Sequence, residues 1–331
     1  MSAQRLRLEI DASPAYEFVL SIAAATSTRN RDAPAELVSE VSGFAGGCDY
    51  VWAHLLSAAY DTPPPRNVTS FVTQVQAMHP RELKLRLVGC YVRYFRRATP
   101  VDAIAAAVDG EAAAIREFTA TSYPDDRLWQ SALSALLPLS AWETRRRLLG
   151  ALRRWQKFFE AQHDPDDLVA EVARRRIQAR ALRPDQMVGA VMDGWEYVAE
   201  PGINAVLLIP SLAIWPNSHV FDHNSTKIIC YPMSHTVAVA SMSPPPELLA
   251  SFQGVADEKR LRILRALAKE DLTAQEVATR LAVGLTTLLH HLDVLREAGL
   301  VSVSGDRRRT YALRRVALTE LEHSLQRYVL Q

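Results

Sequence analysis

The sequence contains few cysteines. Three occur in 331 residues, at Cys48, Cys90 and Cys230, and they are odd in number and far apart. A disulfide framework or a Cys-X-X-Cys metal site needs paired or closely spaced cysteines, so neither is indicated. We therefore expect a reducing compartment. Cys230 lies in an apolar segment, where we expect it to be buried and unreactive.

Long apolar runs are also missing. Runs such as Ala205–Pro210 are far shorter than the ~20 residues that a transmembrane helix needs. The N-terminal segment MSAQRLRLEID lacks the apolar core of a secretory signal. With 48% hydrophobic and 23% charged residues, the chain has the composition of a soluble globular protein. We expect a cytoplasmic protein with no membrane partner.

The common catalytic signatures are absent from the sequence. No GxGxxG, Walker, GxSxG or HExxH segment occurs in the chain. Two adjacent carboxylate pairs, Asp125-Asp126 and Asp166-Asp167, lie near prolines and are typical of helix caps. We therefore expect no enzymatic activity and no cofactor.

The charge is spread unevenly along a chain whose net charge is only +1. Residues Ser251–Gln331 hold 13 Lys and Arg against 10 Asp and Glu, a net charge of +3, and the first 250 residues carry a net charge of −2. A basic C-terminal quarter indicates a polyanionic partner.

Helical periodicity dominates the first 200 residues. Apolar residues recur there at helical spacing, and Ser140 with Glu143 three residues later forms a capping signal. Helices are predicted over Tyr16–Ala25, Cys48–Asp61, Glu82–Arg97, Pro100–Val108, Glu111–Thr119, Leu128–Leu137, Ser140–Gln162 and Pro165–Leu182.

The pattern changes after Gly202. Three β-rich runs, at Ala205–Ser218, Ser225–Met233 and His235–Met242, predict a small antiparallel β element at about 203–242. The prolines of Ser243–Pro246 then form an extended spacer. The fold class is therefore mainly α with a small β element. Residues 1–243 are predicted to form a largely helical sensor or oligomerisation domain, and residues 247–331 a second domain.

Two groups of side chains around the β element have alternative interpretations. His219, Asp222, His223 and His235 are potential metal ligands, but their Pro and Asn neighbours favour a polar hairpin loop, so no metal is predicted. The aromatic residues near them are either core or a candidate effector pocket. These residues are Trp195, Tyr197, Trp215 and Tyr231.

The last eighty residues predict a winged helix-turn-helix. Helices are expected over Asp257–Lys269, from Thr273 through Ala282 with Glu276 completing a capping box, and over Leu285–Ala298, ended by Gly299. Strands Leu300–Val303 and Thr310–Leu313 flank a basic turn. In this fold one helix enters the major groove while the hairpin tip carries cations to phosphates or the minor groove.

Four segments resemble, in order, successive parts of ArsR/SmtB-type bacterial transcriptional regulators. They are DEKRLRILRAL, LTAQEVATRLAV, TTLLHHLDVLREAGLV and DRRRTYALR, within about residues 252–315. The resemblance implies a homodimeric repressor that binds double-stranded DNA and releases it on sensing a ligand. LLIPSLAIWP and the later Tyr231-Pro232 resemble, more loosely, a larger subgroup with an uncharacterised N-terminal domain.

The chain departs from that family at three places. The cysteine pair of metal-sensing members is absent from Thr273–Leu281, and the terminal helix offers only Glu320, Glu322 and His323. The face expected to meet DNA carries Leu285, Thr286, Leu289, His290 and Asp293, where relatives have several small polar residues and often a Lys near Asp293. Leucines and an aspartate are poor phosphate partners, which favours reading by the wing arginines and by DNA shape.

Individual roles follow from the fold and the resemblance. His290 and His291 point about 100° apart on a helix, so they cannot both bind one metal well. We expect His291 to be structural, and the resemblance implies that His290 faces DNA. A 3–4–3 spacing in the last helix predicts a dimer seam, as an alternative to core packing, at Leu318, Leu321, Leu325 and Tyr328. The predicted DNA contacts are Thr273, Gln275, Leu285, Thr286, Thr287, Leu289, His290, Arg307, Arg308 and Arg309.

The sequence therefore predicts a DNA-binding repressor, dimeric and controlled by an unknown small-molecule or protein effector of the N-terminal domain. One alternative is a protein-interaction adaptor whose winged helix no longer reads DNA, which the apolar recognition face motivates. Another is an enzyme in the N-terminal domain that a DNA-binding tail regulates.

Overall fold

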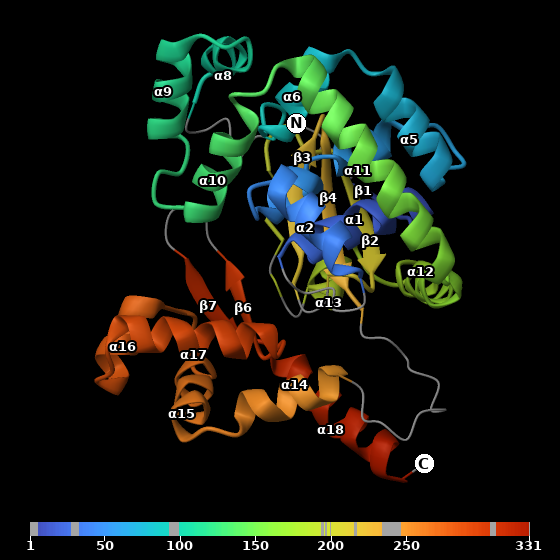
Figure 1. Ribbon diagram of the computed structural model, residues 1–331. Helices are drawn as coiled ribbons and strands as arrows, with labels where there is room; N and C mark the ends of the chain where they lie inside the picture. The colour runs from blue at the N-terminus through green and yellow to red at the C-terminus, as the bar shows by residue number, and fades with distance from the viewer. Residues whose placement is uncertain are drawn as a thin grey trace. The chain divides into compact units, whose positions relative to one another are not determined.

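The chain divides into two compact units. The computed structural model describes residues 6–27, 33–92, 99–192, 195, 197–198, 200–214, 217–233, 246–304 and 309–330. The first unit takes Met1–Met187, Val198–Ile214 and Ser218–Tyr231, and the second takes the remaining segments, chiefly Pro232–Gln331 (Figure 1). The predicted boundary at 243–247 falls mostly on residues outside the described ranges.

The first unit is built mainly from helices, with one four-stranded sheet. A further helix, α13 (Pro184–Val191), straddles the division between the units. In chain order the elements of the first unit are β1 (Arg7–Ile10), α1 (Pro14–Thr26), α2 (Ala35–Phe44), α3 (Asp49–Ala53), α4 (Leu56–Asp61), α5 (Val68–Ala77), α6 (Pro80–Leu87), α8 (Val101–Val108), α9 (Ala112–Thr121), α10 (Arg127–Leu136), α11 (Ala141–Gln162), α12 (Asp166–Gln178), β2 (Ala205–Ser211), β3 (His219–His223) and β4 (Thr226–Pro232).

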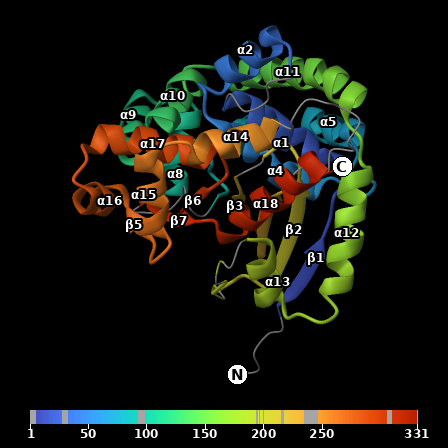
Figure 2. The same ribbon diagram turned by 90° about the horizontal axis from the view of Figure 1, so that it is seen from below.

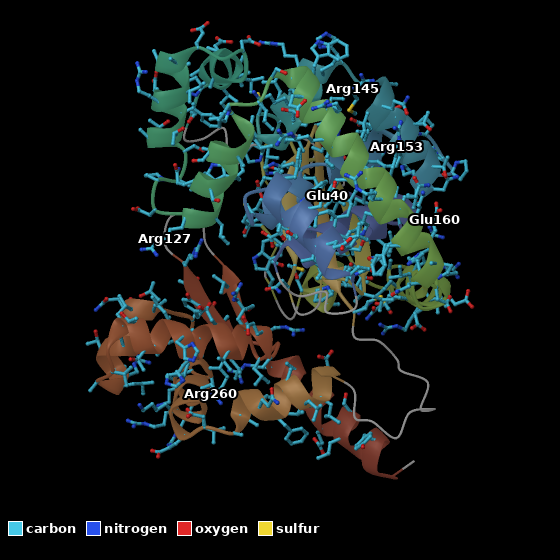
Figure 3. All side chains as sticks on the ribbon, in the orientation of Figure 1. Glu40, Arg127, Arg145, Arg153, Glu160 and Arg260 are labelled. Atoms are coloured by element: carbon cyan, nitrogen blue, oxygen red, sulfur yellow. The ribbon has the colours of Figure 1, made fainter. Side chains whose placement is uncertain are left out.

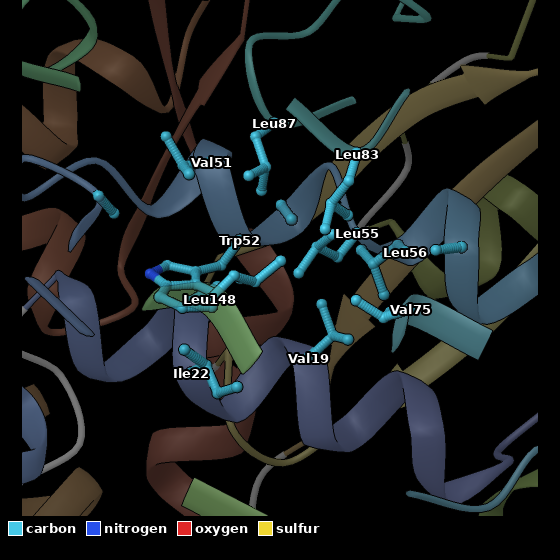
Figure 4. Packing of buried hydrophobic residues seen from close by; sticks show 14 of the residues in the cluster. Val19, Ile22, Val51, Trp52, Leu55, Leu56, Val75, Leu83, Leu87 and Leu148 are labelled. Carbon is cyan, nitrogen blue, oxygen red and sulfur yellow. The ribbon is translucent and has the colours of Figure 1, made fainter. Parts of the chain in front are cut away.

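Helix α1 forms the centre of the first unit. Pro14 occupies its first turn, where the missing N–H costs no hydrogen bond. Every residue from Ala15 to Thr26 is buried, because α2, α3, α4, α5, α11 and β2 surround the helix. Figure 4 shows Ile22 of α1 close to Trp52 and Leu148, and Val19 of the same helix close to Val75. A helix that is apolar on all sides is stable only inside such a core.

The longest helix, α11, links several parts of the unit. Ser140 caps it by accepting a hydrogen bond from the Glu143 N–H at 3.1 Å, as the sequence predicted. On its buried side, Trp155 donates to Ser21 Oγ of α1 at 2.9 Å. On its outer side, Arg153 donates to Gln76 Oε1 of α5 at 2.9 Å (Figure 3).

The sheet of the first unit is mixed, and not purely antiparallel as predicted. Its strand order is β1-β2-β4-β3. Strand β1 pairs in parallel with β2, with Arg7 opposite Ala205, whereas β3 and β4 pair antiparallel. Strand β1 was not predicted because its partner lies almost 200 residues away along the chain. All seven residues of β2 are buried, as in strands covered on both faces.

The segment His219–His223 is strand β3, and the prediction of a polar loop there was wrong. Its side chains alternate, with His219, Phe221 and His223 buried and Val220 exposed. The turn follows at Asn224, whose φ is 54°. The inward positions of β3 therefore include polar side chains. His223 can be buried there because its Nε2 lies 2.8 Å from Asp61 Oδ1 of α4.

Two predicted helices are shorter than expected. The helix predicted over Glu82–Arg97 ends at Leu87, because Gly89 takes a φ of 75° that turns the chain out of the helix. The helix predicted over Cys48–Asp61 is divided into α3 and α4. The remaining predicted helices occur close to their expected positions.

The second unit contains the predicted winged helix-turn-helix elements, together with an N-terminal helix and a two-residue strand that were not predicted. They are α14 (Pro246–Val255), α15 (Glu258–Leu267), β5 (Leu272–Thr273), α16 (Ala274–Leu281), α17 (Leu285–Glu297), β6 (Val301–Ser304), β7 (Thr310–Leu313) and α18 (Arg315–Leu330). The strands form a sheet of order β5-β7-β6, and both pairings are antiparallel. The core of this unit includes Val277, Leu288 and Leu295, which are fully buried.

The apolar side chains of α15 do not all face the core. Leu261 is 52% exposed, whereas Ile263 is only 1% exposed. The buried face of α15 is set by Ile263, Leu264 and Leu267, which places Leu261 on the outside.

Within the described parts of both units, no helix has the length and apolarity needed to cross a membrane.

Candidate nucleic-acid interface

Helices α16 and α17 form a helix-turn-helix. Thr273 caps α16 through a complete capping box, since Glu276 N–H donates to Thr273 Oγ1 at 3.3 Å and Thr273 N–H donates to Glu276 Oε2 at 2.8 Å. The helix ends at Ala282 in the left-handed region, with a φ of 53°. Gly284 then starts α17 as its N-cap. The short turn fixes the direction in which α17 leaves α16.

Helix α17 has two distinct faces. Leu288, His291, Leu292 and Leu295 are buried against the core of the second unit. The predicted DNA contacts on this helix lie on the other face. All of them are exposed: Leu285, Thr286, Thr287, Leu289 and His290. Two large apolar side chains are therefore exposed to solvent, Leu285 at 41% and Leu289 at 39%.

The two histidines of α17 have different environments. His291 is 8% exposed, and burial lowers its pKa. Its Nδ1 lies 4.0 Å from Asp257 Oδ1 at the start of α15. His290 is exposed. The burial of His291 and the exposure of His290 agree with the prediction from helical spacing.

The charge on the far end of α17 is partly balanced. Asp293 is exposed on the same side of the helix as Leu289 and His290. Arg296 Nη2 lies 3.4 Å from Asp293 Oδ1. This pairing reduces the repulsion that an isolated aspartate would exert on a phosphate backbone.

Strands β6 and β7 form the wing. Val301 pairs with Leu313 and Ser304 with Thr310. Arg307 and Arg308 lie outside the described residues. Arg309 is exposed directly before β7. The structure thus places one of the three predicted arginines, at the base of the wing.

The two predicted contacts in α16 differ in their surroundings. Thr273 is 6% exposed and its hydroxyl donates to Glu276 Oε2 at 2.7 Å, so it serves the helix cap. Gln275 is exposed in the first turn of α16. Gln275 therefore has the freer side chain of the two.

Apolar side chains are also exposed on α14 and α18, which contact each other. Leu318 is 43% and Leu325 38% exposed, and Leu321 and Tyr328 are partly buried. Helix α14 adds two exposed residues that the sequence analysis did not single out, Leu249 and Phe252. The apolar spacing of these two residues after the proline spacer is the sequence signal that could have identified them.

Helix α14 packs closely on the end of α17. A Cβ atom at Gly254 would lie 2.6 Å from Ala298 Cβ and 3.0 Å from Leu300 Cδ1. Arg260 of α15 holds the same turn of α14 in place by donating a hydrogen bond to the Gly254 carbonyl oxygen at 2.8 Å (Figure 3). Helix α14 is therefore an integral part of the second unit.

The aromatic residues predicted as an effector pocket are not brought together within one unit. Trp195 and Tyr197 belong to the second unit, with ring centroids 6.3 Å apart, and Tyr231 belongs to the first. Trp215 lies outside the described residues. Tyr231 is buried and donates to Glu171 Oε1 at 3.4 Å.

The candidate metal ligands are dispersed too. Within the described residues, no group of three or more His, Cys, Asp or Glu side chains is close enough to hold a metal ion. Glu320 and Glu322 of α18 are exposed. His235 lies outside the described residues, as does the side chain of His323.

A family model described as a helix-turn-helix domain matches residues 255–304. This segment runs from the end of α14 through β6. The chain carries a C-terminal helix-turn-helix domain. Such a domain points to a DNA-binding regulator. No curated protein matches the chain.

Proposed function

We propose that this protein is a dimeric transcriptional repressor that binds DNA through its helix-turn-helix domain. The observation that carries the proposal is the exposed face of α17. Its threonines and His290 offer hydrogen-bonding groups to base edges, and Leu285 and Leu289 offer apolar contacts. The major groove presents both kinds of partner, including the thymine methyl group. Sites rich in A·T pairs suit this face best.

The wing supplies the charge that the α17 face lacks. Arg309 adjoins β7, and Arg307 and Arg308 stand at the tip in the sequence. Guanidinium groups bind phosphates or enter a narrow minor groove. Binding then combines an apolar reading helix with a cationic hairpin.

Dimerisation follows from the exposed apolar residues of α14 and α18. Leu249, Phe252, Leu318 and Leu325 leave two contacting helices with unburied apolar side chains. A second copy that covers them removes this area from water and places two α17 helices on one duplex. The two half-sites are then about 34 Å apart, one helical turn of DNA.

The effector binds the first unit in this account. A ligand that changes the separation of the two α17 helices disrupts simultaneous docking and weakens DNA binding. The reciprocal effect is that DNA weakens the binding of the ligand by the same factor.

The test is fluorescence anisotropy with duplex DNA from upstream of the gene and with a shuffled duplex, each at several salt concentrations. The proposal requires tighter binding to the upstream duplex and a steep loss of affinity with salt. Arg308→Ala/Arg309→Ala reduces both the affinity and the salt slope. Equal, weak binding to both duplexes at low salt contradicts the proposal.

A protein-interaction adaptor is the second candidate, because Leu285 and Leu289 are exposed on the helix that would read DNA. Exposed leucines are ordinary anchors for a protein groove. An adaptor binds no duplex with sequence preference, and its partner is released by Leu285→Ala and not by the wing variant. The anisotropy experiment therefore separates the two functions.

A further inference from the structure

A cavity of about 490 Å³ opens in the first unit where β1 ends. Its walls include Glu9, Asp11 and Ser13 from the end of β1 and the following loop, Arg66 after α4, and Arg176 and Arg180 at the end of α12. Helix α12 contacts both β1 and β2, and Figures 1 and 2 show it running beside these strands. Small-molecule sites have volumes of roughly 300–1,000 Å³, so the cavity is large enough for a small metabolite.

The two carboxylates of the cavity already have cationic partners. Asp11 Oδ2 lies 3.4 Å from Arg66 Nη1, and Asp11 Oδ1 accepts from the Ser13 N–H at 2.9 Å and the Ser13 hydroxyl at 2.7 Å. Glu9 Oε1 lies 2.8 Å from Arg7 Nε. The charge of each acid is therefore compensated within the protein.

Two arginines of the cavity have no such compensation. Arg176 donates one hydrogen bond, from Nη2 to the Ile10 carbonyl oxygen at 3.0 Å, and forms no ion pair with any described residue. Arg180 forms no ion pair or side-chain hydrogen bond in the described part of the chain. Arg176 lies in the last turn of α12 and Arg180 just beyond its end, and both line the cavity, so their like charges repel each other.

Helix α1 begins directly after the cavity residue Ser13, but its first backbone N–H groups are not available to bind an anion. The Ala15 N–H donates to the Arg66 carbonyl oxygen and the Tyr16 N–H to the Ser13 carbonyl oxygen, each at 3.0 Å. Pro14 has no N–H to offer. The free hydrogen-bond donors of the cavity are thus the guanidinium groups, which suit carboxylate and phosphate oxygens in paired geometry.

We infer that this cavity binds a small organic anion carrying two negative charges on a phosphate or on paired carboxylates. Arg176 and Arg180 hold the anion from one wall, and the Arg66–Asp11 pair lines another. The lining holds three arginines and two acids, and Glu9 is paired with Arg7 outside the cavity, so Arg176 and Arg180 remain to match the two negative charges of such a ligand. Since both arginines are exposed, the affinity is sensitive to salt.

In the proposed repressor, this cavity is the effector site. Only this regulatory role rests on the proposed function. Binding of the anion involves only the first unit and needs no DNA. The cavity is also distinct from the aromatic residues that the sequence suggested as an effector pocket.

The test is isothermal titration calorimetry of the full chain without DNA, with phenyl phosphate and succinate as probes and phenol as the neutral counterpart. The variants are Arg176→Gln/Arg180→Gln and the single Arg180→Glu, which disturbs no hydrogen bond in the structure. The matched control is Arg116→Gln/Arg127→Gln. These two arginines are also exposed and form no ion pair with a described residue, and neither lines the cavity.

The expected result is that at least one anionic probe binds and phenol does not. The affinity falls at least tenfold in the double variant and in Arg180→Glu, and stays within twofold in the control. Failure of both anionic probes to bind the intact chain overturns the inference, and so does equal binding by the cavity variant and the control. Because no DNA is present, this result and the DNA-binding test can fail independently.

Discussion

The Glu17 carboxylate of α1 accepts a hydrogen bond from the backbone N–H of Ala213, 2.9 Å away across the first unit. Its Oε1 also accepts from the Leu212 N–H at 3.0 Å. Glu17 thereby fixes the chain just beyond β2 to the central helix. Burial raises the pKa of Glu17 to about 7, and its hydrogen bonds oppose that shift only in part.

A pH dependence of stability follows. Because the pKa is higher in the folded than in the unfolded state, the folded state binds more protons between pH ~4.5 and ~7. The contribution of Glu17 is then fully present below pH ~4.5 and is lost as pH rises through 7, by roughly 3 kcal/mol. Urea unfolding at pH 5.5 and pH 8 measures it. Glu17→Gln should flatten the slope, and an unchanged slope in that variant refutes the assignment.

Gly254 tests the packing of α14 on α17. Gly254→Ala introduces a Cβ atom at 2.6 Å from Ala298 Cβ, and relief of this overlap costs about 1–3 kcal/mol of unfolding free energy. Gly43→Ala in α2 is the matched control, since nothing lies within 4 Å of its added Cβ. The control should be neutral or stabilising by up to about 1 kcal/mol. Equal effects in thermal unfolding contradict the packing described for α14.

The adjacent histidines of α17 separate folding from DNA binding. His291→Ala removes a buried ring and should lower the unfolding free energy by about 1–3 kcal/mol. His290→Ala removes an exposed ring, so stability should change by less than about 0.5 kcal/mol while DNA affinity falls. Chemical unfolding and anisotropy on both variants check this. The opposite pattern would mean that the two faces of α17 are wrongly assigned.

The proposed dimer is tested on α18. Leu318→Asp/Leu325→Asp places charges on two exposed apolar positions, which a dimer interface does not tolerate and a solvated surface does. Sedimentation velocity should show the intact chain as a dimer and this variant as a monomer. The control is Leu128→Asp in the first unit, where Leu128 is 55% exposed. A monomer at all concentrations of the intact chain argues against the dimer.

The second unit was predictable because its signals are local. The Thr273–Glu276 capping box, the apolar period of α17 and the Gly299 stop each specify structure within one turn of chain. The burial of His291 followed from the same period. The exposure of Leu261 could not be predicted from such a period, because two faces of α15 are apolar in sequence and only packing decides which one is buried.

The first unit was harder to predict because its decisive contacts are distant in sequence. Strand β1 depends on β2, and the inward His223 of β3 depends on Asp61 of α4. The cavity joins Asp11, Arg66 and Arg180, which the sequence keeps far apart. Arg176 and Arg180 alone indicated only a charged helix surface. Only the folded surroundings show that neither arginine forms an ion pair with a described residue.

The central claim is that the outer face of α17 reads DNA. Its most direct test is the anisotropy affinity of Leu285→Ala/Leu289→Ala for the upstream and shuffled duplexes, beside Leu261→Ala, which truncates an exposed leucine outside α17. If this face reads DNA, the α17 variant loses the preference for the upstream duplex and keeps the weak binding to the shuffled one, while Leu261→Ala behaves like the intact chain. An undiminished preference in the α17 variant would contradict it.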